Sequence, residues 1–379
     1  FFMRKTVLAI LAASAGLVAC TRTAGPELIP AENFADTVNG SPVALYTIKG
    51  GDVTLQVTNF GARVVSIFTP DKYGNYEDIV VGYNNISDYV TPPGERFFGA
   101  CVGPVANRIG NAQFEIDGVV YRTPANDNKV NTLHGGYIGL DNVVWDVKSV
   151  TDSSIVLHYL HPDGMEGYPG NKDITMTYTV TSGSEFRIDY LATTDKKTHI
   201  NISNHPFFCL RGEANGTVED YVMSIRASHF IPIDPLSIPT GEIADVTGTP
   251  FDFRTAHTIG QMIGEENEQL RNARGYDHNW CIDRETEKEI ETMCTVYDPE
   301  TGRQIEVLSD QPGIQFYSGN FFEGKSCGKY GRPLGFRSSL ALETQHYPDS
   351  PNRPEFPSTL VEPGQNYTQV CIYRFSAHK

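Results

Sequence analysis

The sequence predicts an all-β protein, a large antiparallel β-sandwich with few short helices. Apolar and polar residues alternate with a period of two along many short runs, which is typical of strands with one buried and one solvated face. Glycine and proline turn signals separate these runs. The composition also suits strands and turns, with 35 glycines, 23 prolines, 19 tyrosines and 20 phenylalanines among 379 residues.

The alternating runs begin after residue 43. They are clearest at 53–58, 113–116, 155–159, 176–180 and 186–190. Turn signals stand at Asp117-Gly118, Pro162-Asp163-Gly164 and Ser182-Gly183. The clearest helical stretch is 258–272, which is rich in Glu, Gln and Leu. No internal repeat of fixed period and no linker interrupts the runs, so we expect one large domain.

The first residues predict a targeting segment. Met3-Arg4-Lys5 is a short basic start, and the apolar run 7–19 is too short to span a bilayer and fits a secretory signal. The run ends at Leu17-Val18-Ala19-Cys20, which looks like a bacterial lipobox, in which the cysteine receives lipid and becomes the mature N-terminus. The alternative is a buried N-terminal helix that contains a cysteine by chance.

This interpretation divides the chain into three parts. We expect a lipoprotein signal peptide at 1–20, a polar tether at 21–35 and one folded domain at 36–379. We also expect the protein in the cell envelope, anchored by lipid to a bacterial membrane on its periplasmic or surface side.

Composition and charge exclude some classes of function. Hydrophobic residues make up 40% and charged residues 20%, which allows a packed core. The formal net charge of −16 argues against nucleic-acid binding, which needs a basic face. Besides Cys20, cysteines stand at 101, 209, 281, 294, 327 and 371. We expect buried free thiols rather than disulfides, and no pair has the spacing of a zinc site.

Three stretches hold chemically useful side chains. Glu343 ends the alternating run that opens at Gly335, and a strand would fix its backbone. His134 precedes two glycines, which let a backbone approach a ligand closely. His205 is followed by Pro206, which fixes the local backbone, and by two phenylalanines. Each alone has a plain structural interpretation, as an exposed glutamate, a turn histidine or a core histidine.

Together with four other stretches, these segments resemble the galactose mutarotase (aldose 1-epimerase) family. The other stretches are 106–110, 275–280, 311–320 and 352–359, and all of them stand in the family's order. The resemblance runs from about residue 43 to the C-terminus. It implies a galactose mutarotase-like supersandwich with its sugar cleft on one concave sheet face, and makes 36–379 an aldose 1-epimerase domain.

The implied reaction interconverts the α and β anomers of a free aldohexose such as galactose or glucose. Ring opening needs a general base at the C1 hydroxyl and a general acid at the ring oxygen, and it needs no cofactor. The resemblance and the chemistry both assign the base to Glu343. We expect His205 to be the acid, since a histidinium has its pKa near the working pH. His134 would hydrogen-bond the sugar near the ring oxygen.

Four further residues are candidates for binding the sugar. The planar guanidinium of Arg108 suits two adjacent hydroxyls, and Asn107 offers a donor and an acceptor. Asp277 would accept hydrogen bonds from hydroxyls, although an Asx-turn after Gly275 is the competing interpretation. Gln315 is a further contact candidate. Trp145 is assigned to the core.

Other functions remain open at this point. A non-catalytic sugar-binding lipoprotein of a carbohydrate uptake system would need Arg108 and Asp277 but no acid and base. A related epimerase of hexose 6-phosphates would need more basic residues, and the export signal argues against it. A glycoside hydrolase could use Glu343 and Asp277, but both histidines would then be unexplained. The sequence does not predict the oligomeric state.

Overall fold

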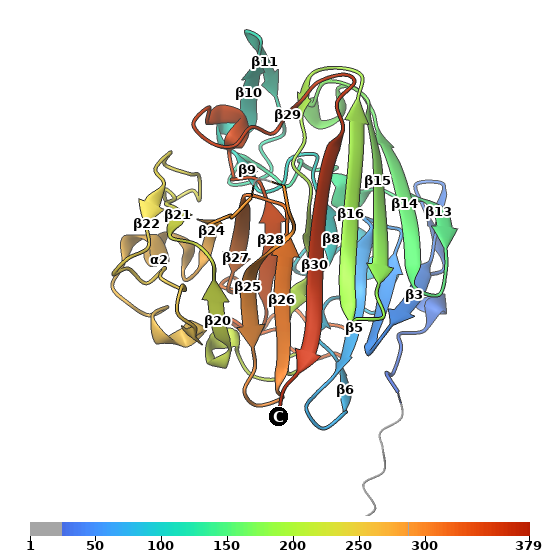
Figure 1. Ribbon diagram of the computed structural model, residues 1–379. Coiled ribbons are helices and arrows are strands. Elements are labelled where there is room, and N and C mark those ends of the chain that lie inside the picture. Colours follow the sequence, from blue (N-terminus) through green and yellow to red (C-terminus); the bar gives the residue numbers. More distant parts are fainter. Residues whose placement is uncertain (1–24, 287) are drawn as a thin grey trace, which may run out of the picture.

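The computed structural model describes residues 25–286 and 288–379. The predicted signal peptide and its Cys20 lie outside the described residues. Two large sheets dominate the fold (Figure 1), and all of their paired strands are antiparallel, as predicted. The long strands of one sheet run across the molecule, and the shorter strands of the other sheet lie behind them.

The larger sheet has nine strands. In spatial order these are β13 (Asp146–Val150), β14 (Ser154–His161), β15 (Lys172–Val180), β16 (Glu185–Thr194), β30 (Tyr367–Ala377), β26 (Arg303–Ser309), β25 (Glu291–Tyr297), β20 (Val222–Ile225) and β23 (His257–Thr258). Along β15, buried residues alternate strictly with exposed or partly exposed ones, as the period of two predicts.

The second sheet has seven strands and is more fully covered. Its order is β22 (Ala244–Asp245), β21 (His229–Ile231), β24 (Asp277–Cys281), β27 (Gly313–Tyr317), β28 (Leu340–Gln345), β19 (Phe207–Phe208) and β7 (Val80–Val81). Every residue of β27 and β28 is buried. Both faces of these strands are therefore covered, one by the core and the other by loops.

The main core lies between the two sheets. Tyr373 of β30 donates a hydrogen bond to the backbone oxygen of Leu342 in β28 (2.8 Å), and its ring lies 5.1 Å from that of Phe208. Alternate residues of the seven-stranded sheet, such as Trp280 and Phe316, enter this core. Their neighbours along each strand must therefore point to the opposite face.

Smaller elements complete the fold. A four-stranded sheet contains β3 (Leu45–Gly50), β4 (Val53–Thr58), β5 (Arg63–Pro70) and β6 (Tyr76–Asp78). Two-stranded pairs are β1 (Asp36–Val38) with β2 (Ser41–Val43), β8 (Ala100–Val102) with β18 (Ser203–His205), β9 (Arg108–Ile109) with β12 (Thr132–Leu133), β10 (Gln113–Ile116) with β11 (Val119–Arg122), and β17 (Thr198–His199) with β29 (Leu360–Val361). The helices are α1 (Ile86–Val90), α2 (Glu268–Ala273), η1 (Ala31–Phe34), η2 (Gly110–Ala112), η3 (Leu140–Asn142), η4 (Met165–Gly167), η5 (Val218–Asp220), η6 (Ile259–Gln261) and η7 (Ser350–Asn352).

The expected helix over 258–272 is wrong in its length. The stretch begins at the end of β23, forms η6 and, after several turn residues, enters α2. Asn267 ends the irregular segment because its side chain caps α2, accepting hydrogen bonds from the N–H groups of Gln269 and Leu270. The helix propensity of the residues before Asn267 was therefore too weak to extend the helix back across this N-cap.

The structure also bears on three other expectations. Trp145 is buried in the core, and its Nε1–H donates to the backbone oxygen of Leu140 (3.1 Å). Among the described residues, the six cysteines are free thiols, all buried except Cys327. Ile29 and Phe34, which lie in the expected tether, are buried on the side of the molecule that holds the four-stranded sheet. This part of the expected tether is therefore folded. No helix in the described ranges has both the length and the apolar character needed to cross a membrane.

Candidate active site

The floor of the candidate site is the outward face of the seven-stranded sheet. Asp277 starts β24, and Gln315 and Glu343 lie directly opposite each other on the neighbouring strands β27 and β28. Glu343 stands inside its strand rather than at its end as expected, because β28 begins at Leu340 and continues to Gln345. Leu342 on one side of it enters the core, so the carboxylate faces away from the core.

Loops from distant parts of the chain cover this face and form a pocket. The pocket is lined by Glu95, Phe97, Asn107, Arg108, Leu133, His134, His205, Phe207, Asp277, Tyr317, Phe321 and Glu343. Six of the seven predicted catalytic and binding residues are among them. Gln315 is buried beside the pocket but is not part of its lining.

His205 and Glu343 form the centre of the pocket. Nε2 of His205 lies 3.4 Å from Oε1 of Glu343, and both side chains are almost fully buried. β18 places His205 through its pairing with β8, and the ring of Phe207 stacks on the imidazole at 4.7 Å. The second carboxylate oxygen of Glu343 and Nδ1 of His205 have no hydrogen-bond partner among residues 25–286 and 288–379. Both groups are thus held in place with hydrogen-bonding capacity unused.

Burial changes the pKa of both groups in opposite directions. Burial raises the pKa of Glu343 well above its usual value, and the nearby Asp277 raises it further. Burial lowers the pKa of His205 to about 4. Each group alone therefore favours its neutral form, and together they hold one proton over a wide pH range.

His134 is held by a reciprocal contact with Asn107. The Asn107 N–H donates to Nδ1 of His134 (3.1 Å), and the His134 N–H donates to the backbone oxygen of Asn107 (3.0 Å). Both residues have positive φ, 51° and 61°. Gly135 follows with φ of 90°, and a Cβ there would lie 1.9 Å from the backbone oxygen of Gly103. This close approach explains why glycine follows the histidine.

The contact with Asn107 also selects the tautomer of His134. Burial lowers the pKa of His134 well below its usual value, so the ring is neutral. Since Nδ1 accepts a hydrogen bond, Nε2 carries the hydrogen and can only donate. His134, His205 and Glu343 have donor atoms within 4.8 Å of one another, which suggests a metal site. The protonated Nε2 does not fit that role, because a metal ligand needs a free lone pair.

Arg108 and Asp277 form the other end of the pocket. Nε of Arg108 donates to Asp127 (3.1 Å), and its Nη1 lies 4.0 Å from a carboxylate oxygen of Asp277. Gln315 donates from Nε2 to the other oxygen of Asp277 (2.8 Å). Gln315 therefore orients Asp277, and its direct contact with a substrate stays a prediction. Burial raises the pKa of Asp277, while Arg108 and the Gln315 hydrogen bond lower it.

Several site residues were not found from the sequence. Glu95, Phe97, Tyr317 and Phe321 line the pocket, and Asp127 supports Arg108. Glu95 and Phe97 stand in the loop that leads into β8, the strand that pairs with the His205 strand. The presence of a carboxylate and an aromatic residue in this loop could have suggested a site, but no periodic pattern in the sequence distinguishes them.

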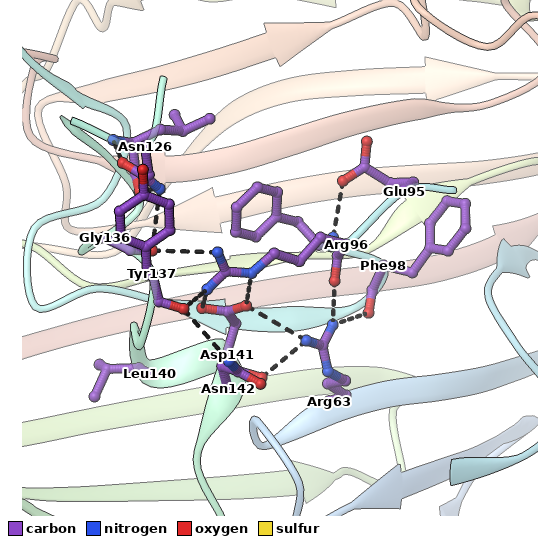
Figure 2. A network of polar contacts seen from close by, with 12 residues as sticks. Arg63, Glu95, Arg96, Phe98, Asn126, Gly136, Tyr137, Leu140, Asp141 and Asn142 are labelled. Carbon is purple, nitrogen blue, oxygen red and sulfur yellow. Dashed lines mark hydrogen bonds and ion pairs between the residues drawn. The ribbon is translucent and has the colours of Figure 1, made fainter. Parts of the chain in front are cut away.

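A buried polar network holds the loop that carries Glu95 and Phe97. Figure 2 shows Arg96 and Arg63 converging on Asp141. Arg96 donates to both carboxylate oxygens of Asp141 (2.7 and 2.9 Å) and to the backbone oxygens of Gly136 and Tyr137. Arg63 donates to the backbone oxygens of Arg96, Phe98 and Asp141. The network therefore joins the Glu95 loop to the loop that follows His134.

Comparison with known proteins identifies relatives of this chain. The family model described as aldose 1-epimerase matches residues 44–374. Galactose mutarotase of Rattus norvegicus is 35% identical over 95% of this chain and 99% of its own length, and aldose 1-epimerase of Escherichia coli (strain K12) is 32% identical over 89% and 97%. An aldose epimerase homologue from C. elegans has a TM-score of 0.81 at 28% identity, covering 89% of this chain and all of that chain. A galactose 1-epimerase from Lactobacillus acidophilus shares the fold, with a TM-score of 0.78 at 24% identity over 91% and 98%.

The match extends over the two large sheets and over every strand and loop that lines the pocket. This chain belongs to the aldose 1-epimerase family.

Proposed function

We propose that this protein is an aldose 1-epimerase that interconverts the α and β anomers of free aldohexoses such as galactose or glucose. The observation that carries the proposal is the buried pair of Glu343 and His205, whose facing atoms lie 3.4 Å apart. The two oxygens that exchange protons during ring opening, O1 and O5, are both bonded to C1. An adjacent base and acid can therefore serve both oxygens of one bound sugar.

The chemistry follows in four steps. Glu343 takes the proton of the O1 hydroxyl while His205 gives a proton to O5. The C1–O5 bond breaks as C1=O1 forms, which yields the open-chain aldehyde and leaves the proton count unchanged. Rotation about C1–C2 exposes the other face of the aldehyde. Ring closure on that face reverses the two proton transfers and restores both side chains.

Burial sets the protonation state of the pair. The shifted pKa values favour neutral Glu343 and neutral His205 in the free site. The reactive form, with an ionised Glu343 and a protonated His205, contains the same number of protons. A proton shift across 3.4 Å converts one form into the other, without exchange with bulk water.

The remaining candidates would bind and orient the sugar. Neutral His134 would donate from Nε2 toward the ring oxygen, which supports the developing hydroxyl. Arg108 and Asp277 would hold hydroxyls at the other end, since their charges are already paired and their atoms are preorganised. Asn107 would act mainly through His134, because its backbone groups hold that loop.

Polarimetry on freshly dissolved α-D-galactose and α-D-glucose tests this function. We expect the protein to accelerate the decay of optical rotation, and Glu343→Gln to lower kcat by about 10²- to 10⁴-fold, the usual contribution of a general base. Calorimetry with the same sugars separates catalysis from binding. Sugar binding without acceleration by the parent protein would instead indicate a non-catalytic sugar-binding protein.

We also propose export and lipid attachment at Cys20. The support is the basic start, the apolar run and the lipobox-like end of residues 1–20. The anchor would place the enzyme in the cell envelope, on the periplasmic or surface side. Fractionation of cells expressing the full chain or Cys20→Ser tests this. Recovery of the parent protein in the cytoplasmic fraction would contradict it.

A further inference from the structure

Glu95 is a carboxylate in the pocket that the proposed reaction does not use. One of its oxygens, Oε1, accepts a hydrogen bond from the Phe97 N–H (2.8 Å). Its backbone oxygen accepts another from the hydroxyl of Tyr83 (3.0 Å). The side chain lines the pocket together with Phe97 and Tyr317. Its other oxygen, Oε2, makes no hydrogen bond within the described part of the chain.

The segment that follows Glu95 is firmly attached to the rest of the fold. Arg96, the next residue, is held by two hydrogen bonds to the fully buried Asp141 (Figure 2). Arg63 holds the backbone oxygens of Arg96 and Phe98, on either side of Phe97. A pocket-lining side chain next to a segment held this firmly, with one carboxylate oxygen free to accept, has the properties of a preorganised ligand contact.

The charges around the pocket point to the kind of ligand. Among the lining residues that the structure describes, Arg108 is the one lysine or arginine. Three lining residues carry carboxyl groups, namely Glu95, Asp277 and Glu343. Donors and acceptors in this ratio suit a neutral polyol, whose hydroxyls each bring a hydrogen to donate. An anionic substituent near Glu95 would meet a like charge, and the nearby guanidinium groups of Arg63 and Arg96 are already paired with Asp141.

We propose that Glu95 is a specificity-determining residue: its free oxygen accepts a hydrogen bond from a sugar hydroxyl away from C1, and its charge rejects sugars that carry a carboxylate or phosphate there. The inference deepens the proposed function and rests on it. Glu95 is assigned no role in proton transfer at C1 or O5, which belongs to Glu343 and His205.

The test compares the parent protein with Glu95→Gln, Glu95→Ala and the control Glu115→Gln. Glu115 is an exposed glutamate on β10, outside the pocket lining, so its variant removes one charge elsewhere. Glutamine at position 95 can still accept from the Phe97 N–H, which preserves the loop, but it replaces the free acceptor with an amide donor. Galactose and galacturonate serve as the neutral and anionic sugars. Binding is measured by calorimetry and turnover by polarimetry.

We expect Glu95→Gln and Glu95→Ala to weaken galactose binding about 10- to 100-fold, the range for loss of a hydrogen bond to a charged group. KM should rise with kcat nearly unchanged, and the preference for galactose over galacturonate should shrink at least about tenfold. Glu115→Gln should match the parent. A role confined to holding the loop would leave the preference between the two sugars unchanged.

The two proposals can fail separately. Parent-like affinity and preference in both Glu95 variants, with normal mutarotation, would overturn the role of Glu95 and leave the function intact. Galactose binding without mutarotation by the parent would overturn the function, while calorimetry would still decide the role of Glu95. A parent protein that neither binds nor converts galactose would overturn both.

Discussion

Glu343, the proposed base, lies in an unfavourable place for a charge. Burial and Asp277 raise its pKa in the folded state, whereas the unfolded chain has the ordinary value. A raised pKa stabilises the fold below the unfolded value, and that stabilisation is lost as pH rises through the folded value. Near neutral pH, Glu343 therefore destabilises the protein relative to a neutral side chain of the same shape.

Glu343→Gln should consequently raise the thermal stability of the protein at neutral pH while removing turnover. The stabilisation should disappear toward about pH 4, where the parent carboxyl is protonated in both states. Thermal melts from acidic to neutral pH check this, with Glu115→Gln as the control for a lost surface charge. A Gln variant less stable than the parent at neutral pH would show that the folded protein stabilises the Glu343 carboxylate more than its burial and the nearby Asp277 indicate.

The pH dependence of kcat/KM should report the paired site. Below about 4, the pKa of His205, the pair gains a second proton and the base is lost. Above the raised pKa of Glu343, the pair loses its only proton and the acid is lost. The profile should therefore be bell-shaped, with limbs that belong to the pair as a whole.

Asp277→Asn provides the internal check on this assignment. Asp277 raises the pKa of Glu343, so its removal lowers that pKa and should move the alkaline limb to lower pH. The acidic limb should change much less, since burial sets the pKa of His205. An alkaline limb that stays in place would show that another group controls it.

The loops over the sheet depend on one buried charge. Asp141 is fully buried and serves Arg63 and Arg96, which together join the Glu95 loop to the His134 loop. Asp141→Asn keeps the volume but leaves the almost fully buried Arg63 without a compensating carboxylate. We expect it to lower the free energy of unfolding by about 3–5 kcal/mol, measured by urea denaturation.

Arg96→Met should behave differently from Asp141→Asn. Its side chain is 25% exposed, so its loss costs less stability, and Asp141 keeps Arg63 as a partner. Its main effect should be a higher KM, because Glu95 and Phe97 lose the Arg96 side-chain attachment and keep the Arg63 contacts to the backbone. Equal losses of stability in the two variants would contradict this division of roles.

A second buried ion pair holds larger parts of the molecule together. Lys329, in the long connection after β27, lies 2.6 Å from Asp78 of β6, and both side chains are fully buried. Tyr330 also donates to Asp78 (3.0 Å). The pair joins the four-stranded sheet to the connection that carries Phe321 into the pocket.

Lys329→Met should lower the free energy of unfolding by about 3–5 kcal/mol, because Asp78 would stay buried without its counter-charge. Adding Asp78→Asn should recover part of this loss, since the asparagine needs no counter-charge. Denaturation of the single and double variants in a double-mutant cycle measures the coupling. Additive losses would mean that the two side chains are stabilised independently.

Much of the fold was predictable from local pattern. The alternating runs form β4, β10, β14, β15 and β16, and the turn signals stand between strands as expected. Alternation predicts strands because successive side chains of a strand point to opposite faces, and one of these faces packs on the core. The helix expected over 258–272 failed because helix propensity is weak and easily overridden by caps and turns.

The sequence by itself determined the family, the all-β fold and six of the residues that line the pocket, since the motifs around Glu343, His205, His134, Arg108 and Asp277 stand together in the family's order. The tertiary structure alone decided how they act together. The 3.4 Å contact of His205 with Glu343, the tautomer of His134 and the place of Glu95 all depend on contacts between distant segments. Distances, burial and pKa shifts arise only when those segments pack, because no local pattern encodes which side chains will share a desolvated space.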